Sequence, residues 1–496
     1  MLAETTSFTL EAITARMVRV EVDVQRGLPA FQIVGLPDAA VREARERVRA
    51  SLVNCGFEFP LRRITANLAP ADLRKVGPGL DLALAAALLG AAGEIPVDRI
   101  REMAFAGELA LDGSVRPVRG ALAMAEAARS RGMAAIVLPP ANGPEAALAA
   151  GIEVRCIGSV SELRDIAGED EFGERPAAID LAVSDEGPDM ADLRGQPHLR
   201  SSLEVAAAGG HSVLMIGPPG SGKSLAARRL PSILPPLSGG EVLEVARIAG
   251  ACGAPGFRIV SKRPFRAPHH TVSAAGLVGG GNPLRPGEIT LAHRGVLFLD
   301  ELCEFRRDAL EALREPLESG EVALSRANSR QVLPARIALV AAANPCPCGR
   351  GEDDPACECA TTAIRRYRAL LSGALADRID MIVAVAQPSA ESMAGAPGET
   401  SKEVRRRVLN AREAMYDRFG EGRTNASATA AEVAAFDIDE AAAGLLSVAY
   451  RRYRMSGRAH DRVLRLARTV ADLESQGPVS ESHLARALQL RRRGES

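Results

Sequence analysis

The sequence contains no tryptophan and only four tyrosines among its 496 residues. A protein that stacks many bases of single-stranded nucleic acid needs several aromatic rings, so this scarcity argues against an extended base-stacking surface. The chain also has no uninterrupted apolar run near the roughly 20 residues that a membrane-spanning helix requires, and its beginning does not resemble a signal peptide. We therefore expect a cytoplasmic protein with no membrane partner.

The charge balance gives no overall attraction to nucleic acid, because the net charge is -1 and the pI is about 6.7. Any nucleic-acid surface must therefore come from local clusters of arginine. Lysine occurs at only four positions. The eight cysteines are interpreted as thiols or metal ligands, since disulfides are rare in the cytoplasm. The length of the chain predicts about three domains.

The stretch around which the chain is organised is a glycine-rich octapeptide between an apolar run, residues 212–216, and a helical pattern, residues 225–230. Strand, glycine loop and helix are the context of a phosphate-binding P-loop, in which backbone N–H groups surround a polyphosphate. The lysine would reach the β- and γ-phosphates, and the final serine would ligate Mg²⁺. A simple turn is the alternative, but one of the four lysines of the chain stands at the position where a P-loop needs a lysine. The predicted ATP-binding residues are Gly217, Pro218, Pro219, Gly220, Ser221, Gly222, Lys223 and Ser224.

A second motif is the apolar run 296–299, which is followed by Asp300 and Glu301. A buried strand of this kind presents the two carboxylates at its carboxyl end. Asp300 suits the Mg²⁺ shell together with Ser224, and Glu301 suits activation of the attacking water. The alternative is that two acids merely end a strand.

A third apolar run, residues 337–343, ends in Asn344, an amide that could orient the lytic water as a sensor residue does in AAA+ ATPases. Farther along, Arg378 stands between Asp377 and Asp380. A guanidinium held by these aspartates could act as an arginine finger on the γ-phosphate of a neighbouring subunit, which would imply a ring. An Asp–Arg pair within one chain is the alternative.

Two further features fall on loops of this region. Residues 321–334 read as a hairpin whose tip carries Arg326 and Arg330, which we regard as candidates for DNA contact, with ordinary solvated arginines as the alternative. The adjacent His269 and His270 have no third ligand nearby, so we expect them to pack or hydrogen-bond rather than to bind a metal.

Four cysteines lie close together in the pattern C-x-C, eight residues, C-x-C: Cys346, Cys348, Cys357 and Cys359. Four thiolates could form a closed tetrahedral Zn²⁺ site that fixes the loop after Asn344. The spacing is tighter than in common zinc knuckles, and free thiols are the alternative.

The alternation of strand and helix signals predicts an α/β class for most of the chain. We expect an N-terminal α/β domain over residues 1–167, an acidic solvated linker over 168–192, an α/β ATPase core over 193–400 and a helical lid over 401–496.

In the expected lid, Arg458 begins the last long helical pattern. This is where the lid of AAA+ ATPases places a second sensor arginine, although Arg462 and Arg465 are neighbouring alternatives.

The N-terminal region resembles the Lon-protease-type domain in residues 75–81, KVGPGLD, and 107–118, GELALDGSVRPV. That family cleaves peptides with a serine and a lysine. Here Gly79 or Leu80 takes the serine's place, and residues 121–124, ALAM, take the lysine's place, so no amine-activated nucleophile can form. The resemblance implies a fold without the protease activity.

Nearly the whole chain resembles the ComM/YifB-type magnesium-chelatase-like AAA+ family, through the order of GPPGSGKS, RPFRAPHHT, GVLFLDE, NPCPCG and DRID. The resemblance implies a hexameric, ATP-driven and Mg²⁺-dependent DNA motor that promotes branch migration in homologous recombination and natural transformation. It leaves protein partners open. A remodeller of proteins and a motor subunit of a magnesium chelatase are the alternative functions.

Overall fold

A computed structural model describes residues 1–168, 172–177, 187–253, 262–326, 329–352, 354–371, 375, 378–474 and 477–491. The contacts divide the chain into two compact units. Unit 1 comprises residues 1–182, 238–261 and 280–286, and unit 2 comprises residues 183–237, 262–279 and 287–496. No helix in the described part of the chain is long and apolar enough to cross a membrane.

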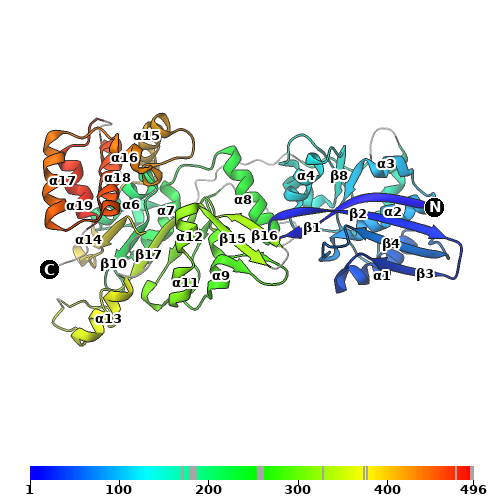
Figure 1. Ribbon diagram of the computed structural model, residues 1–496, viewed down its shortest axis with the longest axis horizontal. Helices are drawn as coiled ribbons and strands as arrows, with labels where there is room; N and C mark the ends of the chain where they lie inside the picture. The colour runs from blue at the N-terminus through cyan, green and yellow to red at the C-terminus, as the bar shows by residue number, and fades with distance from the viewer. Residues whose placement is uncertain are drawn as a thin grey trace. The chain divides into compact units, whose positions relative to one another are not determined.

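Unit 1 is an α/β structure whose main strands come first in the chain (Figure 1). Its strands are β1 (Leu2–Glu11), β2 (Thr14–Gln25), β3 (Ala30–Val34), β4 (Arg63–Ala69), β5 (Met103–Phe105), β6 (Glu108–Leu109), β7 (Val115–Arg116), β8 (Ala135–Leu138), β9 (Glu153–Cys156) and β13 (Arg285–Pro286), and β12 (Gly279–Gly280) lies at the unit boundary. Its helices are α1 (Ala39–Asn54), α2 (Asp81–Ala92), α3 (Val97–Arg101), α4 (Ala121–Ser130), α5 (Gly143–Ala147) and α8 (Gly239–Cys252), with short 3-10 turns at Pro78–Leu80, Pro140–Asn142 and Val160–Ala167.

The main sheet of unit 1 has the strand order β3-β4-β2-β1-β5-β8-β9. Valines at every second position of β2, from Val18 to Val24, face the core, and the Asp38 carboxylate caps α1 by accepting the Val41 N–H at 2.9 Å. Helix α2 is almost wholly apolar and buried from Asp81 to Ala91, because it packs against β1 and β2 in the middle of the unit. The sheet and α2 therefore form one hydrophobic core.

The two stretches that the Lon-type resemblance singles out are buried: Leu80 and residues 121–124 are all in the core. A Cβ at Gly79 would lie 3.4 Å from Val118, and Leu122 is fully buried at the start of α4. The N–H of Leu122 donates to the carboxylate of Glu145 at 3.1 Å. This site is thus a hydrogen-bonded cap on a helix.

Helix α8 belongs to unit 1 although it follows the P-loop in sequence. Arg247 of α8 forms two 2.8 Å hydrogen bonds with Glu126 of α4, and Ala246 joins the buried cluster around α4. The carbonyl of Gly250 accepts the N–H of Gly120, which precedes α4, at 2.9 Å. Part of the range assigned from sequence to the ATPase core thus completes the packing of unit 1.

Unit 2 contains a parallel sheet followed by a helical C-terminal region (Figure 1). Its strands are β10 (Val213–Ile216), β11 (Phe265–Arg266), β14 (Val296–Leu299), β15 (Glu321–Arg326), β16 (Ser329–Pro334), β17 (Ala338–Ala343) and β18 (Met381–Ala384). Its helices are α6 (Pro197–Gly209), α7 (Lys223–Ile233), α9 (Ala274–Val278), α10 (Glu288–Leu291), α11 (Arg307–Glu311), α12 (Arg314–Ser319), α13 (Thr361–Leu371), α14 (Ala390–Ala394), α15 (Ser401–Phe419), α16 (Ala430–Ala434), α17 (Glu440–Arg452), α18 (Gly457–Glu474) and α19 (Glu481–Gln489), with 3-10 turns at Met190–Asp192, Leu302–Glu304 and Asn425–Ser427.

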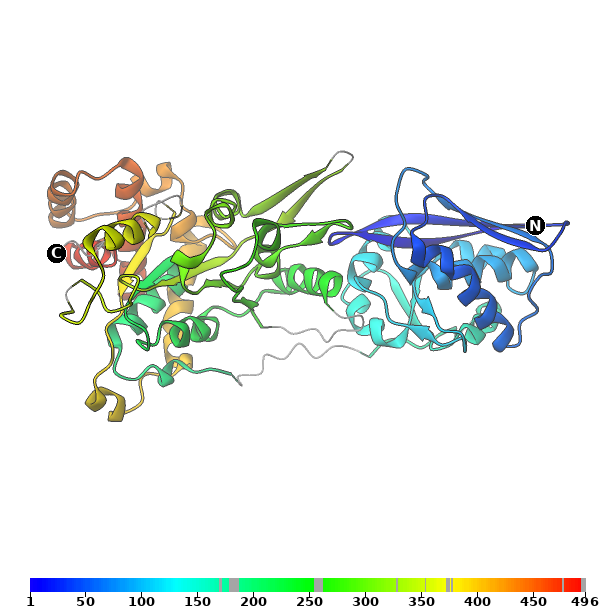
Figure 2. The same ribbon diagram turned by 90° about the horizontal axis from the view of Figure 1, so that it is seen from below.

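The parallel sheet has the order β11-β14-β17-β10-β18. Every strand pair in it is parallel, so the carboxyl ends of β14, β17 and β10 lie at one edge. Strands β15 and β16 form a separate antiparallel hairpin, as predicted (Figure 2). The sheet therefore brings together the loops that follow β10, β14 and β17.

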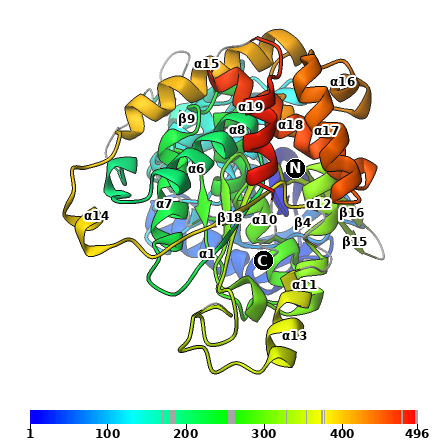
Figure 3. The same cartoon turned by 90° about the vertical axis from the view of Figure 1, so that its left-hand side faces the viewer.

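The C-terminal helices share one hydrophobic core with the parallel sheet. Helix α18 packs against α6, α15 and α19, and α17 packs against α19 (Figure 3). The expected helical character of residues 401–496 is confirmed over the described residues.

The predicted acidic linker contributes folded residues to both units. Phe172 is buried, and Glu174 exchanges two 2.8 Å backbone hydrogen bonds with Cys156 in unit 1. In unit 2, Met190 is buried and its N–H donates to the Ser401 hydroxyl at 2.8 Å. Residues 169–171 and 178–186 of the expected linker lie outside the described part.

Burial raises the pKa of Glu145 to about 7, against hydrogen bonds from Leu122, Asn142 and Ala121 that lower it. A carboxyl whose folded-state pKa is raised stabilises the fold below the pKa of the unfolded chain, and this stability is lost as the pH rises through 7. We expect Glu145→Gln to stabilise unit 1 at pH 8 by up to about 3 kcal/mol, because glutamine carries no charge to bury. Calorimetric unfolding of the full chain at pH 5 and pH 8 measures the difference. The exposed Glu94→Gln is the control, and equal pH dependence of Glu145→Gln and the parent protein would contradict the assignment.

Candidate nucleotide-binding site

A cavity of about 390 Å³ lies where β10, β14 and β17 end. It is lined by the predicted P-loop together with Asp300, Glu301 and Asn344. These residues come from three separate sequence motifs, and the parallel order of the strands places them around one space. The cavity is at the carboxyl edge of the sheet, where open α/β folds bind their ligands.

The P-loop leaves the sheet at Gly217, where a side chain has no room. A Cβ at this position would lie 2.1 Å from the carbonyl oxygen of Val385, so only glycine fits between the two strand ends. Helix α7 then begins at Lys223. Its free N–H groups and the positive end of its dipole face the cavity, which favours a bound phosphate.

The ammonium group of Lys223 is surrounded by oxygen atoms. It donates to the carbonyls of Gly217 at 2.6 Å and Pro218 at 2.9 Å, and the amide oxygen of Asn344 lies 3.4 Å away. Burial lowers the pKa of Lys223, while the nearby charge of Asp300 raises it. The structure thus brings Lys223 and Asn344 together, as their predicted roles require.

The two residues predicted to hold Mg²⁺ are in direct contact. The hydroxyl of Ser224 donates to the carboxylate of Asp300 at 2.7 Å. A hydroxyl and a carboxylate are the hard oxygen ligands that Mg²⁺ prefers beside a polyphosphate, so this pair fits the ion. The arrangement can therefore hold the phosphates of a nucleoside triphosphate together with Mg²⁺.

Glu301 is positioned by a histidine that sequence reasoning did not assign to the site. Its carboxylate lies 3.3 Å from Nδ1 of His270, and its backbone is left-handed, with φ at 52°. The expectation that His270 packs or hydrogen-bonds rather than binds a metal agrees with this contact. The motif RPFRAPHHT in the segment before β14 was the available signal, but only the fold shows that it reaches Glu301.

Gln196, which directly precedes α6, contacts the P-loop. Its amide group donates to the carbonyl of Ser221 at 2.5 Å and to that of Ala386 at 3.3 Å. The side chain therefore ties the P-loop to the segment after β18.

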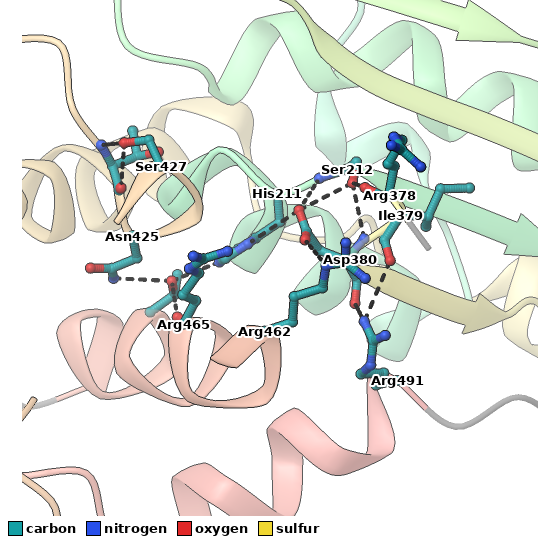
Figure 4. A network of polar contacts seen from close by, with 12 residues as sticks. His211, Ser212, Arg378, Ile379, Asp380, Asn425, Ser427, Arg462, Arg465 and Arg491 are labelled. Atoms are coloured by element: carbon teal, nitrogen blue, oxygen red, sulfur yellow. Dashed lines mark hydrogen bonds and ion pairs between the residues drawn. The ribbon is translucent and has the colours of Figure 1, made fainter. Parts of the chain in front are cut away.

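Arg378 has a partner outside the predicted pair of aspartates. Its guanidinium donates to Glu318 at 2.5 Å, whereas the carboxylate of Asp380 accepts from the N–H and the hydroxyl of Ser212, each at 3.1 Å. The contact with Glu318 does not test whether the flanking aspartates also hold the Arg378 guanidinium, and Asp377 lies outside the described residues. Figure 4 shows Asp380 facing Ser212 and His211. The role of Arg378 as a finger stays a prediction.

The predicted second sensor, Arg458, is exposed in the first turn of α18. Of the two alternatives, Arg462 lies 3.5 Å from Asp380, and Arg465 lies one turn farther along the helix (Figure 4). None of these three arginines lines the cavity described above. The choice of a second sensor stays a prediction.

The four predicted metal-ligating cysteines are brought together. Their sulfur atoms all lie within 4.8 Å of one another, so the cluster could hold a metal ion.

The tip of the predicted hairpin pairs Arg326 with Ser329, and Arg330 is exposed. The side chain of Arg326 lies outside the described part. Contact of these arginines with DNA stays a prediction.

Three family models of the magnesium chelatase subunit ChlI match the chain: magnesium chelatase, subunit ChlI, over residues 189–393; subunit ChlI of Mg-chelatase over 20–142; and the ChlI C-terminal model over 398–491. The chain is 39% identical to the protein YifB of Escherichia coli, over 97% of this chain and 95% of that protein. It is 38% identical to the competence protein ComM of Haemophilus influenzae, over 96% of this chain and 94% of that protein. This chain belongs to the ComM/YifB magnesium-chelatase-like family. The resemblance read from its motifs is confirmed.

The chain has a second, weaker similarity. It is 31% identical to Lon protease 2 of Thermus thermophilus, over 26% of this chain and 16% of that protease. In the Lon-type motifs of this sequence, Gly79 or Leu80 stands in the place of the serine and residues 121–124 stand in the place of the lysine.

We expect Lys223→Ala to abolish ATP binding, because the variant removes the cation that neutralises the phosphates. Glu301→Gln is expected to keep binding and to slow hydrolysis by about 10²- to 10⁴-fold, because the amide cannot accept a proton from water. Binding of a fluorescent ATP analogue and phosphate release measure the two effects. Unchanged turnover in Glu301→Gln would remove this residue from its assigned role.

His270→Ala is expected to lower kcat for ATP hydrolysis about tenfold with little change in KM, because Glu301 loses its partner but the phosphate cradle is intact. His269→Ala is the matched control, since the adjacent ring bonds to Thr271 rather than to Glu301. Steady-state hydrolysis assays separate the two parameters. Equal kcat in both histidine variants would contradict a positioning role for His270.

Proposed function

We propose that this protein is an ATP-driven, ring-shaped DNA motor that moves branched DNA in homologous recombination and natural transformation. The observation that carries the ATPase part is the set of contacts joining Lys223, Asn344, Ser224 and Asp300 at one sheet edge. Bound Mg²⁺ would bridge phosphate oxygens and neutralise their charge during hydrolysis. The family membership supports an ATPase in general.

The choice of DNA as the track rests on the relative named a competence protein, which matches over nearly the full length. Competence is the state in which cells take up DNA, so a motor of this family has branched DNA intermediates to act on. The exposed Arg330 beside the hairpin tip supplies a basic side chain that can contact phosphates. We further propose that the protein works in the cytoplasm.

A ring is proposed because the cavity of one chain is incomplete for hydrolysis. Its lining contains one basic side chain, Lys223, and Arg378 is not among its lining residues. The developing charge of phosphoryl transfer commonly needs an arginine as well. Arg378 supplied by a neighbouring subunit of a hexamer would complete the site.

The proposal is tested on a three-stranded DNA junction with purified protein. We expect the junction to be resolved with ATP and Mg²⁺, but not with a non-hydrolysable analogue and not by Glu301→Gln. Gel electrophoresis of labelled strands measures the conversion. ATP turnover that is stimulated by a protein and indifferent to DNA would favour the remodeller, and turnover coupled to metal insertion into a porphyrin would favour a chelatase subunit.

A further inference from the structure

We propose that Cys346, Cys348, Cys357 and Cys359 bind a structural Zn²⁺ ion, and that the loop held by this ion is a wall of the nucleotide cavity that positions Pro219 and Asn344. The assignment of the metal site rests on the geometry of the four cysteines alone. The effect on ATP rests on the function proposed above.

The spacing of the sulfur atoms matches a tetrahedral ion. The distance from Cys346 Sγ is 3.3 Å to Cys348 Sγ and 3.8 Å to Cys357 Sγ, and Cys348 and Cys357 are 3.6 Å apart. With Zn–S bonds of about 2.3 Å, a tetrahedron of four sulfurs has edges of about 3.8 Å. A disulfide requires only about 2.05 Å between sulfurs. The cluster is therefore spaced for a shared cation and not for cross-links between cysteines.

Backbone N–H groups point at two of the sulfurs. The N–H of Cys348 donates to Cys359 Sγ at 3.4 Å, and the N–H of Gly351 donates to Cys346 Sγ at 3.2 Å. Donors of this kind stabilise the thiolate form, which is the form that binds a metal. Thiolates are soft ligands and favour zinc among the common divalent ions.

The described part of the loop has turns and local hydrogen bonds but few buried groups. The described residues between Asn344 and Ala360 form no helix or strand, and only Cys346 and Gly349 among them are buried. Ordering a backbone costs roughly 1–2 kcal/mol per residue, and so few buried groups do not offset that cost. A closed four-thiolate site offsets it, because metal binding and folding are one process in such segments.

The centre of this loop touches the P-loop. Gly349 has a φ of 86°, and a Cβ there would lie 2.8 Å from two ring carbons of Pro219. The same Cβ would lie 3.9 Å from the side chain of Asn344. The backbone of the cysteine loop thus passes so close to Pro219 of the phosphate cradle that a side chain at Gly349 would clash with it, and the same side chain would reach the sensor amide.

The far end of the loop returns to the same place. Helix α13 starts two residues after Cys359, and its Tyr367 lies close enough to the backbone of Asn344 and to the Cys303 thiol for both groups to affect the pKa of the phenol. Asn344 is thereby tied to the loop directly at one end and through α13 at the other. Release of the metal would free both connections, so the sensor amide and Pro219 would lose their support.

The first experiment is metal analysis of the purified full chain, prepared without chelators. We expect one zinc per chain, retention of zinc in Cys55→Ser, and its loss in Cys357→Ser. Cys55 is the control because it is a free thiol of unit 1 outside the cluster. Absence of zinc, or iron in its place, would overturn the assignment of the metal.

The second experiment uses Gly349→Ala to test the contact of the loop with the nucleotide cavity independently of metal binding. We expect this variant to keep its zinc and to show about ten- to a hundred-fold lower kcat/KM for ATP, since small displacements of positioning groups have effects of this size. Gly351→Ala is the matched control, because a Cβ there would contact Pro345 at an ordinary 3.6 Å rather than the P-loop. Both glycines have positive φ, so backbone strain is common to both variants.

The outcomes distinguish this inference from the proposed function. Equal kcat/KM in the two glycine variants and the parent would overturn the wall, whatever the metal content. ATP turnover that depends on Gly349, in a protein that does not move DNA junctions, would leave this inference standing and refute the motor. Zinc in a chain that does not bind ATP would confine the site to a structural role and overturn the wall.

Discussion

The nucleotide site depends on the ammonium group of Lys223, at the start of α7, which is surrounded by oxygen atoms. An ammonium that leaves water must be compensated by acceptors, and here the acceptors are carbonyls of its own loop and the amide of Asn344. The loop can supply those carbonyls only because Gly217 passes tightly by Val385. Strand order, glycine placement and sensor position are therefore consequences of one requirement: a positive charge must be kept close to a phosphate and away from bulk water.

The same sheet edge connects to the helical region through Asp380. Burial would raise the pKa of this carboxyl, but hydrogen bonds and charge from His211, the N–H of Ser212 and the charge of Arg462 lower it on balance. Ser212 precedes β10, which leads to the P-loop, and Arg462 belongs to α18 (Figure 4). An ionised carboxylate at this point joins the start of β10, the segment that carries Arg378, and helix α18. The parallel sheet and the helical region are therefore connected by charge as well as by their shared hydrophobic core.

Much of the site could be predicted from sequence because its main motifs follow buried strands directly. The P-loop, Asp300 and Asn344 each come directly after an apolar run, and the parallel strands bring the ends of these runs together. The partners of Arg378 and Glu301 could not be predicted in this way. Glu318 is 60 residues from Arg378 in sequence, and His270 lies on an irregular segment whose path only the fold determines. Local pattern indicates which residues carry chemistry, whereas the contacts that hold them are long-range.

The division of the chain into two units could not be predicted from the order of residues in the sequence. The contacts assign residues 238–261 and 280–286 to unit 1, although both stretches stand between the P-loop and Asp300 in sequence. The backbone therefore crosses from one unit to the other at 182–183, 237–238, 261–262, 279–280 and 286–287. Four of these five crossings fall within the segment that joins α7 to β14. The P-loop stands before that segment and Asp300 stands after it in sequence. Unit 1 is therefore built partly from chain that lies between two motifs of the nucleotide site, and a domain boundary read along the sequence could not find this, because the packing of α8 on α4 depends on contacts between residues more than 100 positions apart.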